Sequence, residues 1–156
     1  MTNIDKQVAV IDEEFKKIRE SEPKEVQILK KMVGAFDLTG PLLLYVESET
    51  RELMDYLWIV QAMMREGRLS EEVGKKMFQE ILRFKAGKFI NWYRMHHTAK
   101  LMQDSADALE AARSRDETLK LVDTLSRYMN KWNYWVDYSI PWADIGFVYD
   151  TALGKH

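Results

Sequence analysis

The chain has 156 residues, of which 46% are hydrophobic and 31% are charged, a composition typical of a single globular domain. Its net charge of −2 argues against a protein that coats DNA with its whole surface, because such proteins carry a large positive excess. The absence of cysteine excludes disulfides, thiolate metal sites and cysteine nucleophiles.

The N-terminal third of the sequence predicts two helices. Apolar residues recur every three or four positions from Ile4 to Ile18, which is the spacing of one face of an α-helix. Pro23 interrupts this pattern, and a second stripe over 23–36 predicts another helix. We expect residues 1–36 to form an N-terminal helical arm.

Two long helical patterns, 41–66 and 70–113, dominate the middle of the chain. Pro41 suits the first turn of a helix, because its missing N–H would be unpaired there in any case. Gly67 is typical of a residue that follows a helix, and Ser70 of one that precedes the next. Since so few residues connect the two patterns, they should form an antiparallel hairpin.

The second of these patterns is too long for one straight helix in a domain of this size, because 70–113 would span about 66 Å. We therefore expect a kink or break, at Gly87 or around 103–105. The apolar spacing predicts which residues face the core. They are Val73, Met77, Ile81, Phe84, Asn91, Met95, Met102 and Leu109.

A last helix is expected over 115–139. Ser114 and Glu117 have the spacing of a capping box, in which each side chain bonds the backbone N–H of the other residue. Residues 141–156 are expected to form an aromatic tail. Together these patterns predict an all-α, single-domain bundle of about five helices, whose core spans 41–139 and is built around the hairpin.

The hairpin register predicts an ion pair. Glu49 falls in the apolar stripe of the 41–66 helix, where a carboxylate must be paired, protonated or bound to a metal. If the turn centres near residue 68, opposing positions sum to about 137, which places Glu49 opposite Lys88 and Glu52 opposite Lys85. A structural Glu49–Lys88 pair is the simplest interpretation. The alternative is a carboxylate-based enzyme or ligand-binding bundle that uses Glu49 and Glu52.

A second feature is the stretch 83–100, which is basic, rich in aromatic residues and free of acidic residues. This combination suits RNA or single-stranded DNA, whose phosphates bind Lys and Arg and whose bases stack on rings. It also suits an acidic protein, or it neutralises the acidic residues of the neighbouring helix. The candidate nucleic-acid contacts are Arg83, Lys85, Trp92, Arg94 and Lys100.

No cofactor and no metal are expected from the sequence. His96 and His97 are adjacent, so on a helix their side chains point about 100° apart and do not easily share one ion. No glutamate is followed three residues later by histidine, the motif of di-iron bundles.

The C-terminal region carries a surplus of aromatic residues that do not share one face of the 115–139 helix. A helix that is aromatic on two sides usually lies between two surfaces. One is the chain's own core, and the other is either the tail or another protein. The candidate protein-binding residues are Tyr134, Trp135, Tyr138 and Trp142.

These features favour a non-catalytic helical subunit or adaptor that docks into a larger assembly through its aromatic surface. The expected partner is another protein chain, either a second copy or a different subunit. Nucleic-acid binding through 83–100 is the first alternative, and the carboxylate-based site is the second. No run of 18 apolar residues suggests a membrane span, and we expect a cytoplasmic protein.

Overall fold

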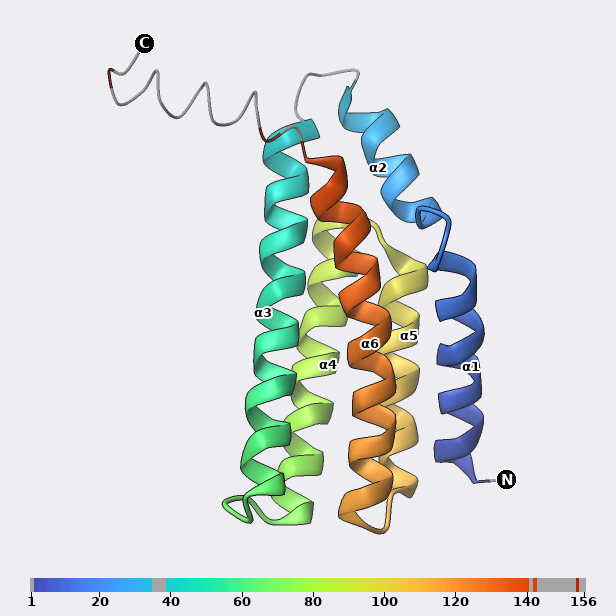
Figure 1. Cartoon of the computed structure of the whole chain (residues 1–156), viewed down its shortest axis with the longest axis vertical. Helices are drawn as coiled ribbons and strands as arrows, with labels where there is room; N and C mark the ends of the chain where they lie inside the picture. Colours follow the sequence, from blue (N-terminus) through green and yellow to red (C-terminus); the bar gives the residue numbers. More distant parts are fainter. Residues whose placement is uncertain (1, 35–38, 141, 143–153, 155–156) are drawn as a thin grey trace.

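The computed structural model describes residues 2–34, 39–140, 142 and 154, and it confirms an all-α bundle (Figure 1). These residues form six α-helices and one 3₁₀ turn, with no strand among them. The elements are α1 (Asn3–Ile18), α2 (Lys24–Gly34), α3 (Thr39–Arg65), α4 (Glu71–Tyr93), α5 (His96–Ala108), the 3₁₀ turn η1 (Leu109–Ala111) and α6 (Arg115–Ser139). Five of the α-helices run along the long axis of the bundle, and α2 is inclined across one end.

The predicted hairpin is present as α3 and α4. Gly67 has a φ of 72°, and its N–H bonds to the carbonyl of Met64 while that of Arg68 bonds to Met63, so α3 ends in a Schellman turn. The Ser70 hydroxyl then accepts a hydrogen bond from the first turn of α4. Local capping therefore sets both ends of the connection.

The long helical pattern breaks after Tyr93, and both predicted positions were wrong. Arg94 adopts a left-handed conformation with a φ of 58°, and the N–H groups of Arg94 and Met95 both bond to the carbonyl of Phe89. Gly87 lies inside α4, and 103–105 lies inside α5. Because this break turns the chain back along α4, the bundle has six helices rather than about five.

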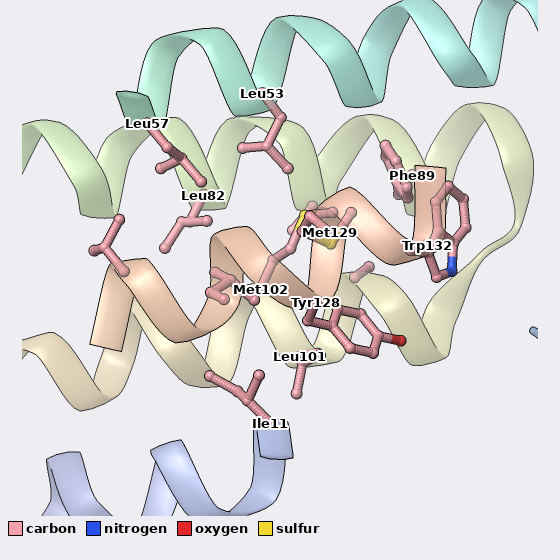
Figure 2. Packing of buried hydrophobic residues seen from close by; sticks show 14 of the residues in the cluster. Ile11, Leu53, Leu57, Leu82, Phe89, Leu101, Met102, Tyr128, Met129 and Trp132 are labelled. Atoms are coloured by element: carbon pink, nitrogen blue, oxygen red, sulfur yellow. The ribbon is translucent and has the colours of Figure 1, made fainter. Parts of the chain in front are cut away.

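The core receives side chains from every long helix. Figure 2 shows part of this core from close by. α1 contributes Ile4, Ile11 and Ile18, all buried against α5 and α6. α1 is therefore a full member of the bundle, whereas we expected residues 1–36 to form an arm beside it. The labelled core residues of Figure 2 are Ile11, Leu53, Leu57, Leu82, Phe89, Leu101, Met102, Tyr128, Met129 and Trp132.

The inner face of α4 differs from the predicted one. Val73, Phe84 and Asn91 are exposed, although the apolar spacing placed them inward. The buried face instead carries Gly74, Phe78, Leu82, Lys85, Ala86 and Phe89. The prediction failed because the buried face includes Gly74, Ala86 and Lys85. Glycine and alanine are only weakly hydrophobic and lysine is charged, so the apolar periodicity does not mark this face.

At the C-terminal end, α6 covers the predicted 115–139 helix, and the Ser114 hydroxyl accepts the Glu117 N–H at 3.1 Å. Of the predicted aromatic tail, 141–156, only Trp142 and Gly154 are among the described residues. None of the described helices has the length and apolar content needed to cross a bilayer.

Candidate functional site

An aromatic surface occupies the C-terminal part of α6 and is formed by Tyr134, Trp135 and Tyr138 with Lys131. The tyrosine side chains are 50% and 72% exposed, so their rings face outward. Their ring centroids lie 6.1 Å apart with planes inclined by 22°, a stacked arrangement. The spacing of four residues produces this stack, because such side chains are neighbours on a helix. We call these four residues the α6 aromatic surface.

Trp135 links this surface to the core. Its ring meets those of Tyr134 and Tyr138 edge-on, with centroids 5.3 and 6.3 Å away. The side chain is only partly exposed, and its indole Nε1 donates to the carbonyl of Ile18 at 2.6 Å, at the end of α1. Trp135 therefore anchors α1 to α6, so the freely exposed part of the surface is the tyrosine pair.

Lys131 supplies a positive charge at the edge of the surface. Its Nζ lies 4.2 Å from the ring centroid of Tyr134 and 5.3 Å from that of Trp135, within the range of cation–π contacts. Trp142, the fourth predicted protein-binding residue, is exposed, and its Nε1 donates to the carbonyl of Asp137 at 3.1 Å. The surface therefore combines flat aromatic area with one cation.

A charge cluster lies between α3 and α4. Lys88 Nζ is 3.1 Å from Glu49 Oε1, so the predicted contact is present in the structure. The central cation is nevertheless Lys85, whose side chain is 0% exposed and whose Nζ donates to both Glu49 and Glu52 at 2.7 Å. Sequence reasoning had paired Lys85 with Glu52 alone.

The electrostatics of this cluster favour a structural role. A hydrogen bond from Lys85 lowers the pKa of Glu52, while burial acts in the opposite direction. Burial, followed by the charges of Glu49 and Tyr45, raises the pKa of Tyr93 to about 12, so this phenol stays protonated. Because Lys85 lowers the pKa of Glu52, this carboxylate is a weaker general base than an unpaired one, which weakens the carboxylate-enzyme alternative.

The structure does not gather the predicted nucleic-acid contacts into one cationic surface. Lys85 is buried, and Arg83 and Lys100 form ion pairs with Asp107 and Asp104 on α5. Both aspartates lie after the acid-free stretch in the sequence. Because the chain reverses direction between α4 and α5, Asp107 nevertheless lies beside α4 and pairs with Arg83.

Arg94 and Trp92 of the same set are exposed at the end of α4. Lys88 Nζ lies 5.6 Å from the Trp92 ring and 4.9 Å from that of Phe84, in addition to its bond with Glu49. Of the five predicted contacts, Lys85 is thus buried, whereas Arg83, Trp92, Arg94 and Lys100 remain exposed.

Sequence reasoning missed a second site, where α2 meets the beginning of α5. The Glu25 carboxylate accepts the backbone N–H groups of His97 and Thr98 at 3.0 and 2.9 Å and so caps α5. His97 Nε2 also lies 2.8 Å from Glu14 Oε2 on α1. The sequence next to α5 offers one indication of this contact. The residue before α5 is Met95, whose side chain cannot cap the helix, so the cap must come from elsewhere in the chain. Among the described residues, no three acidic or histidine side chains are grouped to hold a metal ion.

The cucumopine synthase C-terminal helical bundle domain is the family whose model matches this chain, over residues 4–138. The match begins in α1 and ends one residue before the end of α6, so it includes the hairpin, the charge cluster and the α6 aromatic surface. No curated protein and no solved structure matches the chain.

Proposed function

The chain belongs to the family of cucumopine synthase C-terminal helical bundle domains, and from this premise we propose that it is a non-catalytic docking bundle that binds another protein through the α6 aromatic surface. In cucumopine synthase, the bundle is by its name the C-terminal domain of a larger protein, so it occurs there beside other parts of a synthase. A role beside another folded unit fits this occurrence.

The exposed, stacked pair of Tyr134 and Tyr138 is the observation that carries the proposal. Tyrosine and tryptophan are enriched at protein interfaces, because they bury a large area and lose few rotatable bonds. The contacts among the rings of Tyr134, Trp135 and Tyr138 hold them in place before binding, which reduces the entropy lost on association.

The proposed partner has an apolar centre that covers the two tyrosine rings and an acidic group opposite Lys131. The ammonium group of Lys131 lies beside the Tyr134 ring, at the edge of the aromatic surface. A carboxylate of the partner could pair with it there. A second copy of this chain and a synthase-like subunit are the two partners to distinguish. We also propose that this complex forms in the cytoplasm.

Site-specific photo-crosslinking tests the proposal in cells that contain the native partners. A benzophenone amino acid replaces Tyr138, and in a control chain it replaces Val10, an exposed residue of α1. We expect one discrete adduct from position 138 and none of that mass from position 10. An adduct of twice the chain's mass identifies a second copy, and any other mass identifies a different protein. Absence of an adduct at 138, or identical adducts from both positions, would contradict docking through this surface.

A further inference from the structure

The helices α3 and α6 pack side by side (Figure 1), and a surface groove of about 760 Å³ lies between them. Trp58 of α3 lines this groove, and its side chain is 68% exposed. Met54 lies one turn before it on the same helix and lines the groove as well. The other lining residues are polar or charged, so an apolar contact is surrounded by a polar rim, as in protein interfaces. We call this feature the α3–α6 groove.

The α6 side of the groove continues into the α6 aromatic surface. Asp123, Arg127 and Asn130 line the groove at steps of four and three residues along α6. Tyr134 and Tyr138 follow at further steps of four, so all five side chains share one side of the helix. Eight residues separate Asn130 from Tyr138, which is about 12 Å along the helix axis. The groove is therefore the direct continuation of the surface that we propose for docking.

The charges that line the groove are of both signs. Arg65 and Asp123 pair with each other at 2.8 Å. Asp55 on α3 and Arg127 on α6 form no ion pair within the described part of the chain. Arg127 lies one turn from Lys131, so the two cations available to a partner are both on α6. A complementary occupant carries acidic groups on the side facing α6 and a basic group on the side facing α3.

The secondary structure of the occupant follows from what the groove offers to its backbone. The described residues contain no strand, so an extended segment would find no sheet edge here and would bury unpaired N–H and C=O groups. A helix pairs its own backbone groups and packs its side chains between those of its two neighbours. Over about 12 Å a helix uses eight residues, whereas an extended segment uses about four.

The shape of the groove also distinguishes a different protein from a second copy. In a closed two-fold dimer, a surface meets the same surface of the other copy. Two identical grooves that face each other leave a gap between them rather than filling it. A helix that projects from a different protein fills the groove, so this is the occupant to which the geometry points.

We propose that the partner places an amphipathic helix along the α3–α6 groove and the α6 aromatic surface together. Its apolar side chains pack on Met54 and Trp58 at one end and on the exposed tyrosines at the other, about two turns away. An acidic residue of this helix pairs with Arg127, and a basic residue pairs with Asp55. This inference rests on the proposed docking function and adds the form of the partner and a second anchor, Trp58.

Photo-crosslinking from two positions of the full chain tests the proposal. Separate chains carry the benzophenone amino acid at Trp58, at Tyr138 and, as a control, at Trp92, which is 67% exposed on α4. Mass spectrometry of the digested adducts identifies the protein and the attached residues. We expect positions 58 and 138 to attach to one segment of one protein, at sites seven to nine residues apart, because a helix of that length covers about 12 Å. Position 92 should not attach to that segment.

The other outcomes separate this inference from the proposed function. Attachment from position 138 without attachment from position 58 would overturn the inference and leave docking through α6 intact. Sites three or four residues apart would indicate an extended segment and would also overturn it, as would an adduct of this chain with itself. No adduct from position 138 would contradict the proposed function and this inference together.

A synthetic peptide with the sequence of the crosslinked segment then measures the contribution of Trp58. Trp58→Ser and Ile59→Ser each remove an exposed apolar side chain from α3, but only Trp58 lines the groove. We expect Trp58→Ser to weaken peptide binding at least about tenfold, as for a buried aromatic anchor, and Ile59→Ser to change it less than about twofold. Equal affinities of the two variants would refute a role for the groove. Thermal unfolding of both variants checks that each remains folded.

Discussion

Lys85 shows how a charged residue comes to occupy the interior of this bundle. Its alkyl chain lies on the inner face of α4, while its ammonium group ends between Glu49 and Glu52 of α3. Removing an ammonium group from water is costly unless charged acceptors replace the water, and two carboxylates at 2.7 Å do so here. Tyr56 adds a ring 5.8 Å from the ammonium.

The first prediction follows from this pairing. Lys85→Ala leaves two neighbouring carboxylates without their shared cation, and we expect it to lower the free energy of unfolding by about 3 kcal/mol, the lower end for a broken buried pair. The lower end applies because Glu52 is 44% exposed and partly screened by water. Urea unfolding measures the change. Lys120→Ala, which removes an exposed pair with Asp5, should lower the free energy of unfolding much less, because water screens that pair. Equal costs for the two variants would show that the cluster has no special role.

The second prediction concerns pH. The pKa of Glu52 is lowered from its ordinary value of 4.5 by the hydrogen bond from Lys85. A carboxyl group with a lower pKa in the folded state stabilises the fold above its unfolded-state pKa, and this stabilisation is lost as the pH falls through the folded-state pKa. We therefore expect stability to decrease below about pH 4.5 and to decrease less steeply in Glu52→Gln. Urea unfolding between neutral and acidic pH compares the two slopes, and identical slopes would contradict this role.

At the scale of elements, two glycines of α4 have opposite surroundings. A Cβ atom added at Gly74 would lie 2.3 Å from Met64 Sδ, and Met64 is buried where α3 packs on α4. At Gly87, an added Cβ would meet nothing within 4 Å. Gly74 therefore allows the two helices of the hairpin to approach, whereas Gly87 only lowers helix propensity.

The third prediction uses these glycines as a matched pair. Gly74→Ala should lower the free energy of unfolding by about 1 to 3 kcal/mol, because the buried Met64 must move to an unfavourable rotamer. Gly87→Ala should raise it by about 0.5 to 1 kcal/mol through helix propensity. Thermal and urea unfolding of both variants provide the test. Stabilisation by both substitutions would mean that Met64 adjusts freely and that the approach of α3 and α4 is not tight.

At the scale of the whole molecule, the α6 aromatic surface divides into a part that binds α1 and a part that faces outward. Trp135 belongs to the first part through its bond to the carbonyl of Ile18. Tyr134 and Tyr138 belong to the second. This division allows assembly to be tested separately from folding.

The fourth prediction follows from that division. The double substitution Tyr134→Ser with Tyr138→Ser should abolish the proposed complex and change the unfolding free energy by less than about 1 kcal/mol, because both side chains are exposed. Native mass measurement and thermal unfolding report the two effects. Trp135→Ser provides the contrast, since losing its bond to Ile18 should loosen α1 and lower the melting temperature. If the double variant assembles normally, the partner binds elsewhere on the bundle.

Local sequence determined the helical class of this protein and several of its boundaries. Gly67, Ser70 and Ser114 act on the residues next to them, so their capping roles could be predicted without knowledge of the fold. The short connection between α3 and α4 also set their register, which placed Glu49 opposite Lys88. These features depend on neighbours in the chain or across one turn.

The tertiary structure alone decided the features that depend on distant segments. The break at Arg94 carries no glycine or proline signal, and it is held by bonds back to Phe89. Glu25 caps α5 from 72 residues away in the sequence. The burial of Lys85, and that of the Trp132 indole N–H without a partner among the described residues, depend on which helix faces meet. Apolar periodicity records the average polarity of a face, whereas pairing, capping and cavities depend on the particular atoms that packing brings together.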